Sequence, residues 1–165
     1  MIHIVSGNKE QILTTDLSAN STQGRWAYMD GQNASGDPQV TPVGSSAAAQ
    51  YDRHRLVCIG KVTISQNDGD PLHETIYINN GGTNDDGRKP YMIIGAGIAI
   101  EDDELDARVT GDFEGADFGA AMSLTTSGYA TLTGASDAVG SATKVAYFDN
   151  IKGDVVTYVT DTSAT

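Results

Sequence analysis

The sequence is poor in cysteine, proline, basic residues and long apolar runs. One cysteine, Cys58, stands in 165 residues, which excludes an internal disulfide framework and a zinc cluster built on cysteines. Ten Lys and Arg residues stand against 22 Asp and Glu, for a formal net charge of −12. A chain this acidic, with no run of basic residues, repels a polyphosphate. We therefore expect no nucleic-acid partner.

No segment has the composition of a secretory signal or a membrane span. The first residues, 1–7, contain a short apolar stretch without a basic region before it, unlike a signal peptide. The longest apolar run, Tyr91–Ile100, has about half the length that a bilayer span requires. The sequence therefore predicts a soluble protein with no membrane partner.

Glycine, threonine and serine are frequent, and they favour strands over helices. The chain has 19 glycines, and these residue types weaken a helix interior. Over residues 56–65, Leu56, Cys58, Val62 and Ile64 share one parity, which is typical of a strand with one buried face. Further strands are expected over residues 75–79, 91–100, 25–29 and 107–110.

The C-terminal part shows short strands at regular spacing. Strands are expected over 128–133, 144–148 and 154–160, with a loop over 134–141 and a turn over 149–153. Short helices are expected over 46–53 and 116–122, and polar surface loops over 30–46 and 81–89. We predict an all-β protein, a small antiparallel β-barrel or sandwich with long polar loops and at most one or two short helices. Residues 23–165 would form one β-rich domain, preceded by residues 1–22 as an extended arm or an edge strand.

Motifs for catalysis or metal binding are not found. The acidic clusters 67–70, 84–87 and 101–104 offer oxygen ligands suited to Ca²⁺, but none has EF-hand spacing, and the same residues favour solvated turns. The three histidines are scattered. Gly95 and Gly97 lack the third glycine and the helix of a dinucleotide fingerprint. We therefore predict no enzyme, no catalytic residue, no metal ligand and no cofactor.

Three groups of residues are candidates for contact with a partner. Trp26 and Tyr28 could form a carbohydrate-stacking platform or an interface anchor, although a single Trp in a small β-domain more often fills the core. The other candidates are a mixed-charge cluster at a strand entry and a polar loop. They comprise Asp52, Arg53, His54 and Arg55 in the cluster, and Asn84, Asp85, Asp86 and Arg88 in the loop.

The C-terminal strands resemble those of a known group of proteins. Gly128–Thr131, the small-residue loop 134–141, Lys144–Asp149 and Gly153–Val159 are similar in order to the end of the small β-barrel decoration, or cement, proteins of tailed-phage heads. Those chains end with a strand carrying a Val-Ala or Ile-Ala core, a turn, and Gly-Asp followed by alternating Val and Thr. The resemblance covers about a quarter of the chain and transfers no functional residue.

The resemblance implies a virion structural protein without catalysis. Such a subunit is made in the host cytoplasm, binds the major capsid protein on the outside of the assembled head, and forms a homotrimer or homodimer. The net charge of −12 would keep the free subunit soluble.

Two other classes of function stay open from the residues alone. One is a β-sandwich module that binds a carbohydrate or a receptor through Trp26, Tyr28 and the acidic loops, with or without calcium. The other is a small barrel enzyme, for which the three scattered histidines offer no motif.

Overall fold

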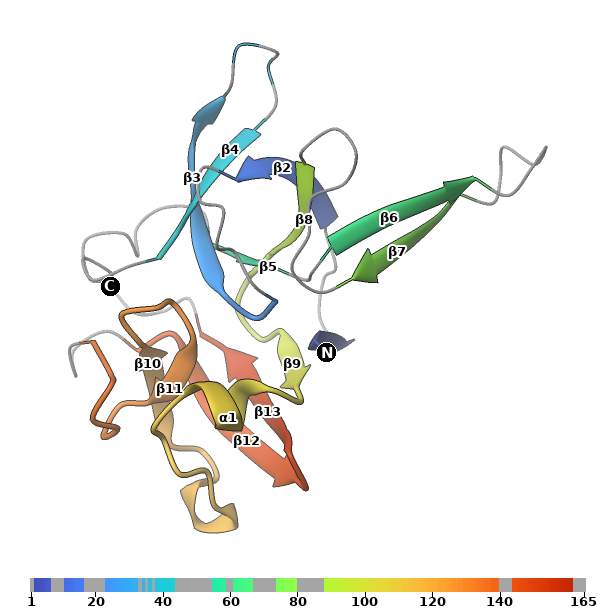
Figure 1. Ribbon diagram of the computed structural model, residues 1–165. Coiled ribbons are helices and arrows are strands. Elements are labelled where there is room, and N and C mark those ends of the chain that lie inside the picture. The colour runs from blue at the N-terminus through green and yellow to red at the C-terminus, as the bar shows by residue number, and fades with distance from the viewer. Residues whose placement is uncertain are drawn as a thin grey trace.

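The computed structural model describes residues 2–6, 11–16, 23–32, 34, 36, 38–43, 55–58, 61–66, 74–79, 88–139 and 144–161. Figure 1 shows a six-stranded sheet in its lower half, a five-stranded ring above it, and a two-stranded ribbon that extends away from the ring. Strands dominate, and the α-helix among the described residues has four residues. The predicted all-β class with at most one or two short helices is confirmed.

The six-stranded sheet is open and antiparallel throughout. Its order is β1 (Ile2–Ser6), β9 (Ala99–Asp102), β13 (Val155–Thr160), β12 (Ala146–Lys152), β10 (Ala121–Leu124) and β11 (Ala130–Leu132). β1 and β11 are therefore its two edge strands. Edge strand was one of the two expectations for the N-terminal residues, and β1 pairs with β9 from Ile2↔Asp102 to Ser6↔Ala99.

The ring contains five short strands in a closed order. They are β2 (Gln11–Asp16), β4 (Pro38–Pro42), β3 (Trp26–Gln32), β5 (Arg55–Cys58) and β8 (Arg88–Ile93). The closing pair, β2 with β4, is parallel and consists of two residue pairs, Thr15↔Gln39 and Asp16↔Val40. Because the six-stranded sheet stays open, the whole molecule is not one small barrel. β4 lies where a surface loop was expected over 30–46.

The ribbon pairs β6 (Lys61–Gln66) with β7 (Glu74–Asn79), from Lys61↔Asn79 to Gln66↔Glu74. The single strand expected over 56–65 is thus divided between β5 of the ring and β6 of the ribbon. β6 also contacts β8, which connects the ribbon to the ring.

Residues 91–100 form two strands, whereas one strand was expected. β8 ends at Ile93 and β9 begins at Ala99, and Gly97 between them adopts a φ of +72°. The turn is held by Thr160, whose carbonyl accepts the Gly97 N–H at 2.7 Å and whose Oγ1 accepts the Ile98 N–H at 2.9 Å. These bonds direct the chain from the ring into the six-stranded sheet.

Three other expectations about elements are wrong. Residues 116–122 do not form a helix, because β10 takes residues 121–124 and buries Met122 and Leu124; a 3₁₀ turn (Gly115–Asp117) precedes it. Residues 107–110 do not form a strand, because α1 (Leu105–Arg108) buries Leu105 and pairs Glu104 with Arg108 one turn apart. The turn expected over 149–153 lies at Gly153 and Asp154, since β12 runs to Lys152.

The hydrophobic core lies between the six-stranded sheet and the ring. The larger buried cluster contains Trp26, Tyr28 and Met92 from the ring together with Phe148 and Tyr158 from the sheet. Full burial of one such side chain contributes about 1.5–3 kcal/mol. A smaller cluster of Ala27, Val40, Leu56 and Tyr91 fills the ring.

No helix among the described residues is long and apolar enough to cross a membrane. The helix expected over 46–53 lies outside the described residues.

Candidate functional site

The six-stranded sheet has one buried face and one half-exposed face. Along β13, Val156, Tyr158 and Thr160 are buried, whereas the residues between them are partly exposed. β9 alternates in the same way, with Ile100 and Asp102 buried. Because successive side chains in a strand point to opposite faces, the partly exposed residues form a second surface. We call it the outer face.

A row of uncharged residues crosses the centre of the outer face. Ala99 of β9 pairs with Val159 of β13, Val159 pairs with Tyr147 of β12, and Tyr147 pairs with Ala121 of β10. Tyr147 is 37% exposed, and the other three are half-buried. On the edge strand β1, Val5 is 50% exposed. The next row contains Glu101 opposite Thr157.

A lysine lies over the aromatic ring in this row. Lys144 Nζ is 4.2 Å from the Tyr147 ring centroid and 2.8 Å from Asp161 Oδ2. The hydrogen bonds to Asp161 and Tyr147 raise the pKa of Lys144 above its ordinary value. The contact positions the Tyr147 ring at the surface, because a cation over an aromatic face is attracted to its electron density.

At the β10 end of the row the surface is hollowed by a depression of about 400 Å³. It lies between β10, the segment 110–112 and the loop that follows β11. Ala121 lines this depression and also ends the row, so the two features are continuous. The loop is held in place by Asp137, whose Oδ2 accepts the Thr110 N–H at 2.7 Å.

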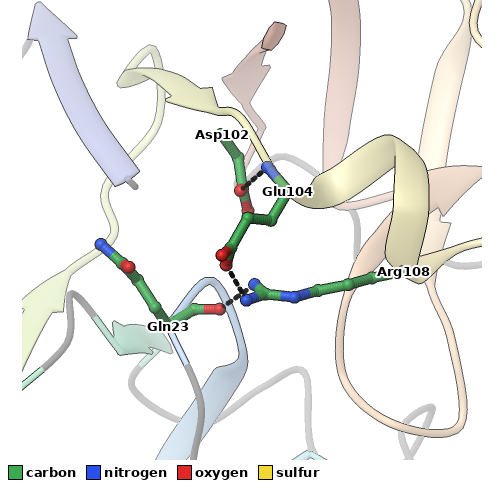
Figure 2. A network of polar contacts seen from close by, with 4 residues as sticks. All are labelled: Gln23, Asp102, Glu104 and Arg108. Carbon is green, nitrogen blue, oxygen red and sulfur yellow. Dashed lines mark hydrogen bonds and ion pairs between the residues drawn. The ribbon is translucent and has the colours of Figure 1, made fainter. Parts of the chain in front are cut away.

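A polar junction connects the six-stranded sheet to the start of β3. Figure 2 shows Arg108 of α1 donating to the Gln23 carbonyl and pairing with Glu104, whose N–H donates to Asp102 Oδ1 at 3.0 Å. The Arg108 guanidinium also lies 5.3 Å from the Tyr129 ring centroid. These hydrogen bonds join α1 and the end of β9 to the segment that precedes β3, so the junction connects separate parts of the chain.

Asp102 of this junction also has a buried carboxylate oxygen, and Tyr158 and Trp26 carry two more buried polar groups. Asp102 Oδ2, the Tyr158 hydroxyl and Trp26 Nε1 are each buried without a hydrogen-bond partner of ordinary geometry among the described residues. Burial raises the pKa of Asp102, and the Glu104 N–H and the Arg108 charge lower it by less. Burial, together with the Asp102 charge, raises the pKa of Tyr158 well above its ordinary value. With Asp102 and Trp26 each 1% exposed, these groups are not placed to contact a substrate.

Trp26 and Tyr28, the aromatic candidates, lie in the core. Tyr28 is buried in the same cluster as Trp26. The expectation that Trp26 fills the core is therefore confirmed, and Trp26 and Tyr28 do not form an exposed stacking platform.

The charged candidates are not brought together at a described site. Arg55 begins β5 opposite Tyr28, and Arg88 begins β8 opposite Thr15. Asp52, Arg53, His54, Asn84, Asp85 and Asp86 lie outside the described residues, as do the acidic clusters 67–70 and 84–87. In the cluster 101–104, Asp102 faces the core. No three His, Cys, Asp or Glu residues of the described part are grouped to hold a metal ion.

The outer face was not found from the sequence. In the segment 155–159, Val-Val-Thr-Tyr-Val, both parities are β-branched or aromatic, so polarity does not separate the buried face from the exposed one. The signal that could have indicated the outer face is the presence of apolar residues, such as Val155 and Val159, at the alternate positions that are partly exposed.

Comparison with known proteins returned no relative. No protein-family model matches this chain, and no curated protein or solved structure matches it.

Proposed function

We propose that this chain is an adhesion protein without catalysis, a decoration or cement subunit that binds the outside of an assembled tailed-phage head. The resemblance of its C-terminal strands to cement proteins is one support. The other is the outer face, which offers a broad surface for docking.

The uncharged row across the outer face is the observation that carries the proposal. On a chain of net charge −12, the four residues of the row, Ala99, Val159, Tyr147 and Ala121, are uncharged and cross four adjacent strands. The one charged group described over the row, Lys144 above the Tyr147 ring, is paired with Asp161. Interface centres are depleted in charge and enriched in tyrosine, which is often an energetic hot spot. Strands in a sheet hold such residues in a rigid arrangement, so little ordering entropy is lost on docking.

The mechanism is mass action. A ligand that binds the assembled lattice but not its dissociated subunits stabilises the lattice, and at a concentration of 100 Kd the gain is about 2.7 kcal/mol per site. Many sites on one shell multiply this effect. The major capsid protein is the partner in this proposal, and the subunit is a homotrimer or homodimer on the capsid exterior, with no nucleic-acid or membrane contact.

The test is co-sedimentation of the purified chain with undecorated heads of the phage that encodes it. We expect wild-type chain to pellet with the heads and to saturate at a fixed number of copies per head. Val159→Lys and Tyr147→Ala should weaken binding at least tenfold, because a desolvated hot spot contributes about 2 kcal/mol or more.

The matched control for Val159→Lys is Asp106→Asn, which makes the same change in net charge at an exposed position of α1. This control should bind as the wild type does. Circular dichroism and melting temperature establish that each variant is folded. The proposal is wrong if wild-type chain stays in the supernatant, or if both outer-face variants bind like the wild type.

A further inference from the structure

The depression at the β10 end of the outer face has an apolar floor. Leu132, Ala120, Ala121 and Ala135 are half-buried and line it, whereas Thr110, Asp112 and Ser136 line it as exposed residues. Its volume of about 400 Å³ lies within the range of small-ligand sites, roughly 300–1,000 Å³. It can therefore receive a long side chain whose stem is apolar and whose head is polar.

The charge of the depression is negative and uncompensated. Asp112 and Asp117 line it, and none of its lining residues is Lys, Arg or His. Asp112 is exposed, and its side chain makes no hydrogen bond or ion pair with the described residues. Asp117 Oδ2 accepts the Glu114 N–H at 3.0 Å, which leaves its other carboxylate oxygen available for a ligand.

We infer that this depression binds a long basic side chain, an arginine or a lysine, of the surface on which the outer face docks. Such a side chain combines an apolar stem, which suits Leu132 and Ala121, with a cationic head for the two carboxylates. A guanidinium is the better match, because it donates to carboxylates in pairs.

The depression is continuous with the outer face, so its occupant is expected to come from the partner that docks on that face. Ala121 belongs to both the row and the depression, so a partner that covers Tyr147 and Ala121 also reaches the depression. The inference rests on the proposed function for the identity of that partner. The complementarity itself, a cationic head against two carboxylates, is a property of this chain.

The first experiment measures the depression alone, by NMR titration of the isotope-labelled chain with N-acetyl-arginine methylamide. The uncharged citrulline analogue is the matched probe, and the lysine analogue is a second cation. We expect amide shifts confined to residues 110–121 and 132–136 with the cationic probes and none of that size with citrulline. Asp112→Asn should weaken arginine binding about tenfold, the value of one hydrogen bond to a charged group. Asp154→Asn, an exposed change in the β12–β13 turn, should not weaken it.

The second experiment repeats the co-sedimentation with heads using Asp112→Asn. A loss of about tenfold in affinity supports the inference. It is overturned if citrulline shifts the same amides equally, or if Asp112→Asn changes neither titration nor co-sedimentation. Binding of the arginine probe by a chain that never co-sediments with heads would instead refute the proposed function while keeping the site.

Discussion

Gly128, in the turn between β10 and β11, brings the six-stranded sheet into backbone contact with the ring. Its carbonyl accepts the Trp26 N–H at 2.8 Å, and the Trp26 carbonyl accepts the Val43 N–H at 2.8 Å. Gly128 has a φ of +83°, and a Cβ there would lie 2.8 Å from the Val43 carbonyl oxygen and 3.3 Å from the Trp26 carbonyl oxygen. An alanine must therefore displace backbone and not a flexible side chain.

The cost of Gly128→Ala follows from these contacts. A left-handed conformation costs a non-glycine residue about 1–2 kcal/mol. Loss of the two backbone hydrogen bonds, from the Trp26 N–H to Gly128 and from the Val43 N–H to Trp26, costs about 0.5–1.5 kcal/mol each. We expect the free energy of unfolding to fall by about 2–5 kcal/mol, measured by urea denaturation with an unchanged m-value.

Substitutions at two other glycines distinguish the cost of the left-handed conformation from the cost of the close backbone contact. Gly153 has a φ of +62° and nothing within 4 Å of its would-be Cβ, so Gly153→Ala should cost the conformational part, about 1–2 kcal/mol. Gly134 has an open environment without a positive φ, so Gly134→Ala should be neutral or stabilise by up to about 1 kcal/mol. If Gly128→Ala costs no more than Gly153→Ala, the close contact between the sheet and the ring is refuted.

Three further predictions concern the buried polar groups and the shell. Because burial raises the pKa of Asp102 above 3.8, the folded state binds that proton more tightly, and stability should fall as pH rises through the raised pKa. Asp102→Asn should remove this part of the slope and be more stable than wild type at neutral pH; a difference in unfolding free energy that is constant from pH 4 to 8 would contradict this. Tyr158→Phe should cost less than about 1 kcal/mol in urea denaturation, since its hydroxyl has no hydrogen-bond partner of ordinary geometry among the described residues, and a loss above about 2 kcal/mol would contradict this. Heads that lack this chain should release DNA at a lower temperature than decorated heads, and equal heat tolerance would refute the proposed stabilisation of the head.

The sequence predicted the fold class because its frequent glycine, threonine and serine disfavour helices and its short strands recur at regular spacing. The prediction of individual elements failed where tertiary contacts decide. Residues 121–124, Ala-Met-Ser-Leu, have helix propensity, but Met122 and Leu124 are buried between β11 and β12. The strands expected over 128–133 and 144–148 are therefore not neighbours in the sheet, since β10 lies between β11 and β12. Competition from neighbouring strands cannot be read from a single segment.

The candidate site was harder to predict than the fold. Trp26 has the chemistry of both a core residue and an anchor, and its position in β3 between the sheet and the ring makes it core. Tyr147, in contrast, lies at an exposed position of β12. Its place in an uncharged row is recognised only from the pairing of β12 with β13 and β10, which puts Val159 and Ala121 beside it. The depression depends on a loop that returns to Thr110 through Asp137, a contact between residues 27 positions apart.

The central claim is that the outer face is the surface of adhesion, and cryo-electron microscopy of heads incubated with the purified chain tests it most directly. We predict density at symmetry-related positions outside the shell, with Tyr147 and Val159 facing the capsid protein and the depression beside Asp112 occupied by a basic side chain. Density in which β12 and β13 face solvent, or heads without added density, would contradict the account.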